Sequence, residues 1–202
     1  MIFSSGQLIL VTGASSGIGK AIAMKCVENG ATVLACGRNA ERLEQGKREC
    51  VVPERWLSVQ KDLLASMEEL PAWLRDLAKM YGRFWGLVCS AGMASMDSVR
   101  TFSLEASRDL FDLNFNVPML LAKGMADRRI HAKGGALLFI SSVAALYAEK
   151  GHLLYGASKA ALANAAKSLS QELAPLGLRV NCIAPGIVDT PMERAAEEYM
   201  GP

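Results

Sequence analysis

Short apolar runs alternate regularly with longer segments of helical periodicity along this chain. The apolar runs predict six strands, at residues 8–11, 32–36, 56–59, 87–89, 136–140 and 178–183. The segments between them predict five helices, at about 18–28, 39–50, 66–81, 103–128 and 152–174. Parallel strands need crossover connections, which are usually helices. The pattern therefore predicts a doubly wound α/β fold of Rossmann type, in which helices cover both faces of one parallel sheet.

Local signals predict where several of these helices begin and end. Asn39 is placed to cap the second helix, and Ser66 begins a Ser-x-x-Glu sequence with the spacing of a capping box. Asn29-Gly30 supplies a stop for the first helix, and Pro175 and Gly177 end the last one.

Composition limits the classes of protein that the chain can belong to. Its 202 residues, 51% hydrophobic and 21% charged, are expected to form a single globular domain over residues 1–202. A net charge of +2 does not favour nucleic-acid binding, and no apolar run approaches the ~20 residues of a membrane span. The N-terminus lacks the pattern of a signal peptide, so we expect a cytoplasmic protein. The five cysteines include no Cys-x-x-Cys pair, so we expect them to be reduced thiols. Because there are only two histidines besides, we expect no metal site.

The residues after each strand are the candidates for chemistry, because ligands of such sheets bind outside the carboxyl ends of the strands. The sequence Thr-Gly-Ala-Ser-Ser-Gly-Ile-Gly at 12–19 follows the first strand and leads directly into a helix. Its glycines at 13, 17 and 19 allow a tight turn, and the following helix N-terminus attracts a pyrophosphate. An ordinary glycine-rich turn is the alternative, but the position between strand and helix favours dinucleotide binding.

The residues after the second strand bear on the choice between NAD and NADP. No acid occurs between Ala31 and Ala40, whereas an acid at this place would hydrogen-bond a free ribose 2'-hydroxyl. Arg38 offers a permanently charged fork that suits a phosphate. This favours NADP, although Arg38 could instead pair with Glu41 or Glu44 on the following helix.

A serine, a tyrosine and a lysine provide a candidate catalytic group. Ser142 follows the fifth strand, and Tyr155 and Lys159 stand four residues apart on the last helix. That spacing places both on one helix face, where the ammonium is expected to lower the pKa of the phenol. Ser142 could donate a hydrogen bond to a carbonyl oxygen that gains charge. Alone, the Tyr/Lys pair would more often be a surface pair, but its place after a dinucleotide turn favours catalysis.

Together these motifs resemble the short-chain dehydrogenase/reductase family, from Gln7 to about Met192. Asp62 after the third strand, Asn114 in the fourth helix and Pro185-Gly186 followed by Thr190 also match. The resemblance implies that Tyr155 protonates the nascent alkoxide, Lys159 holds the nicotinamide ribose, Ser142 orients the carbonyl and Asn114 binds a water in the proton relay. It also implies an NADP(H) site formed by Gly13, Ser15, Ser16, Gly17, Ile18, Gly19, Gly37, Arg38, Asn39, Asp62, Leu63, Ala91, Gly92, Tyr155, Lys159, Pro185, Gly186, Ile187, Val188 and Thr190.

The sequence departs from the family pattern at two places. The usual Asn-Asn-Ala-Gly after the fourth strand is Cys89-Ser90-Ala91-Gly92, so an asparagine side chain is absent at Cys89. The chain ends at Pro202, before the family's substrate loop and seventh strand are complete. We therefore expect six strands, with the sixth presenting an unpaired edge unless a partner or altered packing covers it.

The expected function is that of an NADP-dependent oxidoreductase of the carbonyl reductase type, which interconverts a ketone and a secondary alcohol on a small-molecule substrate. A dinucleotide-binding protein with little or no turnover is the alternative. The resemblance implies a homo-oligomer, and the small residues of the last helix, around Ala160, Ala163, Ala166 and Lys167, predict an isologous dimer through the helices.

Overall fold

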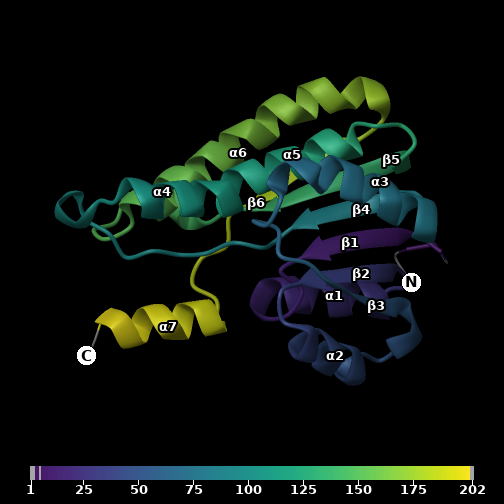
Figure 1. Cartoon of the computed structure of the whole chain (residues 1–202), viewed down its shortest axis with the longest axis horizontal. Coiled ribbons are helices and arrows are strands. Elements are labelled where there is room, and N and C mark those ends of the chain that lie inside the picture. Colours follow the sequence, from purple (N-terminus) through teal and green to yellow (C-terminus); the bar gives the residue numbers. More distant parts are fainter. Residues whose placement is uncertain (1–2, 5, 201–202) are drawn as a thin grey trace.

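The computed structural model describes residues 3–4 and 6–200, and their core is a six-stranded sheet (Figure 1). The strands are β1 (Leu8–Thr12), β2 (Thr32–Gly37), β3 (Trp56–Gln60), β4 (Phe84–Cys89), β5 (His131–Ile140) and β6 (Arg179–Ile183). They lie in the order β3-β2-β1-β4-β5-β6, and every neighbouring pair is parallel. This confirms the predicted doubly wound sheet, and the order reverses between β1 and β4, where such folds bind ligands.

Helices cover the two faces of the sheet unequally. One face carries α1 (Gly17–Glu28) and α2 (Ala40–Glu49), while the other carries α3 (Leu70–Tyr81), α4 (Leu104–Phe111), α5 (Val117–Met125) and α6 (Leu153–Leu173) (Figure 1). Each face has its own cluster of buried apolar side chains. All residues of β1 are buried, because both of its faces are covered. Burying one such aliphatic side chain contributes about 1.5–3 kcal/mol, so the central strands hold the turns that follow them firmly in place.

Several predicted helix boundaries are confirmed, and the one at Ser66 is wrong. Asn39 caps α2 by accepting a hydrogen bond from the Arg42 backbone N–H at 2.8 Å. The expected capping box at Ser66 does not form, because Ser66 has a left-handed backbone (φ 55°) and its side chain caps nothing. The α-helix begins instead at Leu70, with Pro71 in its first turn, where the missing N–H needs no partner.

The predicted helix at 103–128 is interrupted. A π-helical turn over Asp112–Asn116 separates α4 from α5, and such turns are frequent at functional sites. The apolar residues recur with helical spacing through both α4 and α5, without an intervening polar stretch. The sequence pattern therefore could not show the change of helix type between them. Helix α7 (Pro191–Met200) was not predicted at all, and it lies beyond the carboxyl ends of the strands (Figure 1).

β6 forms one edge of the described sheet, as predicted. Its Arg179, Asn181 and Ile183 are exposed, whereas Val180 packs into the core. Within the described chain, no helix combines the length and the apolar character needed to cross a bilayer. The five cysteines are free thiols.

Candidate active site

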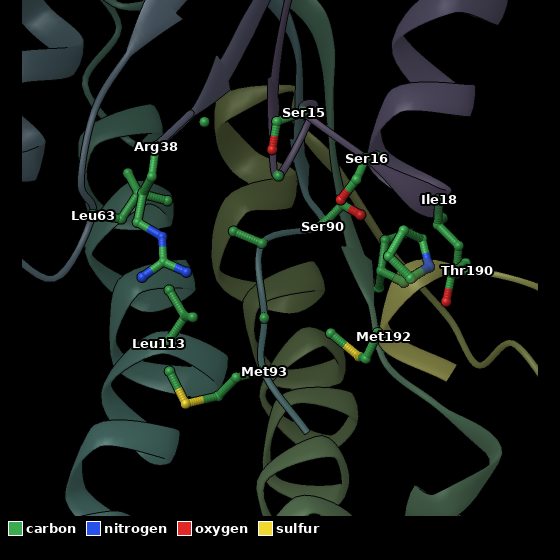
Figure 2. Close-up of a pocket in the computed structure, with 18 of the residues that line it drawn as sticks. Ser15, Ser16, Ile18, Arg38, Leu63, Ser90, Met93, Leu113, Thr190 and Met192 are labelled. Carbon is green, nitrogen blue, oxygen red and sulfur yellow. The ribbon is translucent and has the colours of Figure 1, made fainter. Parts of the chain in front are cut away.

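A cavity of about 330 Å³ opens at the carboxyl ends of the strands. With two exceptions, Asn114 and Ile187, every residue expected in the cofactor and catalytic sites lines it. Figure 2 shows part of this cavity, with Ser15, Ser16 and Ile18 at one wall and Met93 and Leu113 at another. Its volume lies in the range typical of small-molecule sites.

The glycine-rich turn approaches the neighbouring backbone so closely that side chains would not fit. Gly13 has φ +69°, and a Cβ there would lie 2.8 Å from the Ala91 nitrogen. A Cβ on Gly19 would lie 2.3 Å from the Gly13 carbonyl oxygen. The turn is also tied to the loop after β4, because the Thr12 hydroxyl oxygen accepts hydrogen bonds from the Ser90 and Ala91 N–H groups at 3.1 and 3.2 Å.

The beginning of α1 has the chemistry of an anion site. Ser16 stands at the N-cap position without a side-chain capping bond, and the first turn of the helix contains no acidic residue. The positive end of the helix dipole therefore faces the cavity without a negative side chain of its own helix to neutralise it. This arrangement fits the pyrophosphate of a dinucleotide, which Gly17, Ile18 and Gly19 would hold through their backbone.

Cationic side chains gather at the end of the cavity formed by β2 and β3. Arg38, Arg42 and Lys61 all line it, and Figure 2 shows Arg38 extending into the space beside Leu63. Gln60 donates a hydrogen bond to the Arg38 carbonyl oxygen at 3.1 Å, which holds the backbone there. Among the described residues Arg38 has no ion-pair partner, so the alternative of pairing with a neighbouring glutamate is not what the structure shows. Sequence reasoning missed Arg42 and Lys61, which it had no means to distinguish from surface charges.

Ser142, Tyr155 and Lys159 meet at the opposite end of the cavity. Ser142 caps a short 3-10 turn after β5, and a hydrogen bond joins its side chain to Tyr155. Lys159 is buried, and its Nζ donates to the Ile140 carbonyl oxygen at 2.9 Å. The Ser141 hydroxyl donates to the Lys159 carbonyl oxygen at 2.8 Å and so fastens α6 to the end of β5. The predicted catalytic residues are therefore brought together.

The expected effect of Lys159 on the tyrosine pKa is not observed. Burial raises the pKa of Tyr155 above its ordinary value, and the hydrogen bond with Ser142 opposes that shift. The Lys159 ammonium lies 5.7 Å from the centre of the tyrosine ring and donates to a backbone carbonyl, and burial outweighs any lowering of the tyrosine pKa. Burial also lowers the pKa of Lys159 to about 8. Sequence spacing correctly placed the two groups on one face, but it could not orient the ammonium.

Asn114 lies behind the cavity wall and holds the loop after β4. Its side-chain oxygen accepts from the Met93 N–H at 2.9 Å, and its amide donates to the Met93 carbonyl at 2.9 Å and to the Ser158 hydroxyl at 3.1 Å. Both amide hydrogens are thus used within the protein. A water could reach this side chain only at the remaining acceptor position of its oxygen.

Asp97 is a residue of this region that sequence reasoning missed. Its carboxylate accepts from the Leu154 N–H at 3.0 Å and from the Ser95 hydroxyl at 2.6 Å. Its backbone N–H donates to the Gly151 carbonyl at 2.8 Å. Asp97 therefore caps α6 from a distant loop, whereas His152, the N-cap residue of the helix itself, makes no side-chain cap. A partner 57 positions away leaves no local signal.

The segment after β6 and the first turn of α7 close one side of the cavity. Val188, Thr190, Pro191, Met192 and Glu193 line it, and the last three of these were not anticipated as cofactor or catalytic residues. Ile187, expected to contact the cofactor, is 86% exposed and is not among the residues that line the cavity, so its contact stays a prediction.

Cys89 packs as an apolar residue, 3% exposed, in the core beneath the cavity. Burial raises the pKa of its thiol, so it remains protonated and neutral. The expected contact of an asparagine side chain is absent, but the adjacent Ser90 and Ala91 N–H groups still find an acceptor in Thr12. The turn remains hydrogen-bonded without that side chain.

The fold is a doubly wound parallel sheet with a glycine-rich turn before α1. A Ser/Tyr/Lys group lies at the far end of the same cavity. These features define a nucleotide-dependent oxidoreductase of the short-chain type. Residues 7–200 match the family model described as short chain dehydrogenase, and the chain belongs to this family. Members of the family bind nicotinamide dinucleotides.

The relatives agree with this assignment. The chain is 34% identical over 192 residues to a 3-oxoacyl-[acyl-carrier-protein] reductase of Aggregatibacter actinomycetemcomitans, covering 91% of this chain and 77% of that protein. It is similar to a dehydrogenase/reductase of Sinorhizobium meliloti with a TM-score of 0.85 and 30% identity, over 98% of this chain and 81% of that one. A short-chain dehydrogenase of Shigella flexneri, solved in complex with NADP, has a TM-score of 0.85 and 29% identity, over 96% and 83% of the two chains.

Proposed function

We propose that this protein transfers a hydride between NADP(H) and a small-molecule ketone or secondary alcohol, with Tyr155 as the general acid-base. The observation that carries the proposal is that Ser142 and Tyr155 line the same cavity as the glycine-rich turn and Arg38. One end of the cavity thus offers a phenolic proton, and the other offers sites for phosphate groups.

Different residues along the cavity would bind different parts of the cofactor. The N-terminus of α1 would hold the pyrophosphate, and Arg38 would bind the 2'-phosphate through a charge-assisted fork. Arg42 and Lys61 would add positive charge around the same phosphate. The NADP complex of the Shigella flexneri relative supports the choice of cofactor.

Catalysis by the chain's own residues consists of orienting one oxygen and supplying one proton. When bound, the nicotinamide supplies the hydride that adds to the carbonyl carbon, or accepts it in the reverse direction. The Ser142 hydroxyl would donate a hydrogen bond to the carbonyl oxygen, and Tyr155 would donate its phenolic proton to that oxygen as it becomes an alkoxide. Lys159, whose ammonium lies 5.7 Å from the centre of the tyrosine ring, would hold the nicotinamide ribose beside Tyr155.

The test is NADPH oxidation with a panel of ketones, comparing the wild type with Tyr155→Phe. Because general acid-base catalysis supplies about 10²- to 10⁴-fold in rate, turnover should fall by that factor while NADPH affinity and melting temperature stay close to the wild type. Retention of more than about a third of the turnover, with chemistry shown to be rate-limiting, would remove Tyr155 from this role. Tight NADPH binding without turnover of any compound would favour the alternative, a dinucleotide-binding protein.

A further inference from the structure

The charged side chains of the cavity are separated along its length. Arg38, Arg42 and Lys61 line the end that would hold the adenosine phosphate, whereas Glu193 lines the wall near Tyr155. Glu193 belongs to the first turn of α7, and its backbone N–H donates to the Thr190 hydroxyl oxygen at 3.2 Å. A carboxylate thus occupies the part of the cavity where the reaction is proposed to occur.

The Glu193 carboxylate is close enough to Tyr155 for its charge to act on the phenol. Glu193 acts on the Tyr155 hydroxyl through its charge, in addition to the effect of burial. The buried ammonium of Lys159 is shifted by its burial and by the thiols of Cys182 and Cys89, and Glu193 is not among these causes. Glu193 and Tyr155 both line the cavity, so a substrate held at the phenol would have this carboxylate among its neighbours.

Glu193 is a partly buried carboxylate without a counter-ion among the described residues. Asp189, on the segment leading into the same helix, differs from Glu193 because it has a cationic partner. Asp189 accepts two hydrogen bonds from the Arg194 guanidinium, at 2.7 and 3.0 Å. Removing a carboxylate from water without a cationic partner is unfavourable, so a ligand that supplied the positive charge would gain from it.

We infer that Glu193 selects substrates that carry an ammonium group close to the reacting carbonyl or hydroxyl, and disfavours those with a carboxylate or phosphate at that place. The inference rests on the proposed function for the location of the reacting carbon. Met93 and Met192 also line the cavity, and their apolar side chains would accept the hydrocarbon part of such a substrate (Figure 2). An amino ketone or amino alcohol has both properties.

Three methyl ketones share the group CH3-CO-CH2 and differ in the charge of the group attached to it. Aminoacetone carries an ammonium, 2-butanone is neutral, and acetoacetate carries a carboxylate. We expect the wild type to show a kcat/KM at least tenfold higher for aminoacetone than for acetoacetate, with 2-butanone between them. The preference should shrink at about 0.5 M salt, because a half-buried charge is partly screened. Binding of the matching alcohols to the NADP⁺-saturated protein, measured by calorimetry, provides a second readout that does not need turnover.

Glu193→Gln keeps the shape of the side chain and removes its charge, so it should bring the aminoacetone to acetoacetate ratio to within about twofold of unity. Glu193→Asp should retain part of the preference. Glu172→Gln makes the same change in net charge at the exposed, far end of α6, and should leave the ratio unchanged.

The outcomes separate the inference from the proposed function. If the wild type reduces none of a wide panel of ketones, the proposed function fails, and the calorimetric comparison still decides whether Glu193 binds ammonium compounds. If ketones are reduced but Glu193→Gln leaves the ratio as in the wild type, the inference is overturned. It is also overturned if the variant mainly tightens NADPH binding, since Glu193 would then face the cofactor phosphates.

Discussion

The cap that Asp97 places on α6 links a surface loop to the position of Tyr155. The Asp97 carboxylate accepts from the Leu154 N–H at 3.0 Å, and Tyr155 is the next residue, within the first turn of the helix. His152 provides no cap of its own, so nothing else on α6 replaces this bond. We expect Asp97→Ala to loosen the first turn of α6 and to displace the tyrosine hydroxyl from Ser142.

The size of the effect can be estimated from the lost interactions. Loss of a side-chain cap costs about 0.5–2 kcal/mol, and loss of a negative charge beside a helix N-terminus costs about 0.3–1 kcal/mol. The free energy of unfolding should therefore fall by about 1–3 kcal/mol. A displacement of ~1 Å at a reacting group can cost ~10²-fold in rate, so kcat should fall by about 10- to 100-fold. NADPH affinity should change little, because α1 and Arg38 do not depend on this bond.

The assay combines urea denaturation, NADPH titration and steady-state kinetics on one ketone. Asp97→Asn keeps a good capping group and should retain kcat within about threefold. Ser103→Ala is the matched control, because Ser103 caps α4 through the Ala106 N–H at 3.3 Å and that helix does not carry Tyr155. It should lower stability by a similar amount with little change in kcat. If Asp97→Ala reduces kcat no more than Ser103→Ala does, Asp97 is a stabilising cap and does not position the tyrosine.

Two further expectations concern the cofactor and the assembly. Arg38→Ala should weaken NADPH binding at least about tenfold and leave NADH binding nearly unchanged, because hydrogen bonds to charged groups contribute about 1.5–3 kcal/mol. An equal loss of affinity for both cofactors in fluorescence titrations would show that Arg38 does not bind the 2'-phosphate. We also expect two copies to pair through α6, where Ala160 and Ala163 are partly exposed, although Ala166 is buried in the core and cannot contribute. Light scattering at several concentrations tests this, and a strictly monomeric protein would reject it.

The sequence by itself determined the order of strands and helices along the chain. It also determined most of the residues that line the cavity. Strand β1 is buried on both faces, and the apolar run at residues 8–11 makes that property visible in the sequence. The glycine-rich turn, the Asn39 cap and the strand-end residues are equally local. Once the strands are known to be parallel, their carboxyl ends must share one edge, which is why Arg38, Ser142 and the turn at 13–19 could be assigned to one site.

Only the tertiary structure decided how these groups act on one another. The direction of the Lys159 ammonium depends on the Ile140 carbonyl, 19 positions away, and the cap on α6 depends on Asp97, 57 positions from its partner. The approach of Glu193 to Tyr155 depends on where α7 packs after β6. Hydrogen bonds and charges act over a few ångströms in space regardless of separation in the chain, so periodicity and spacing carry no record of them.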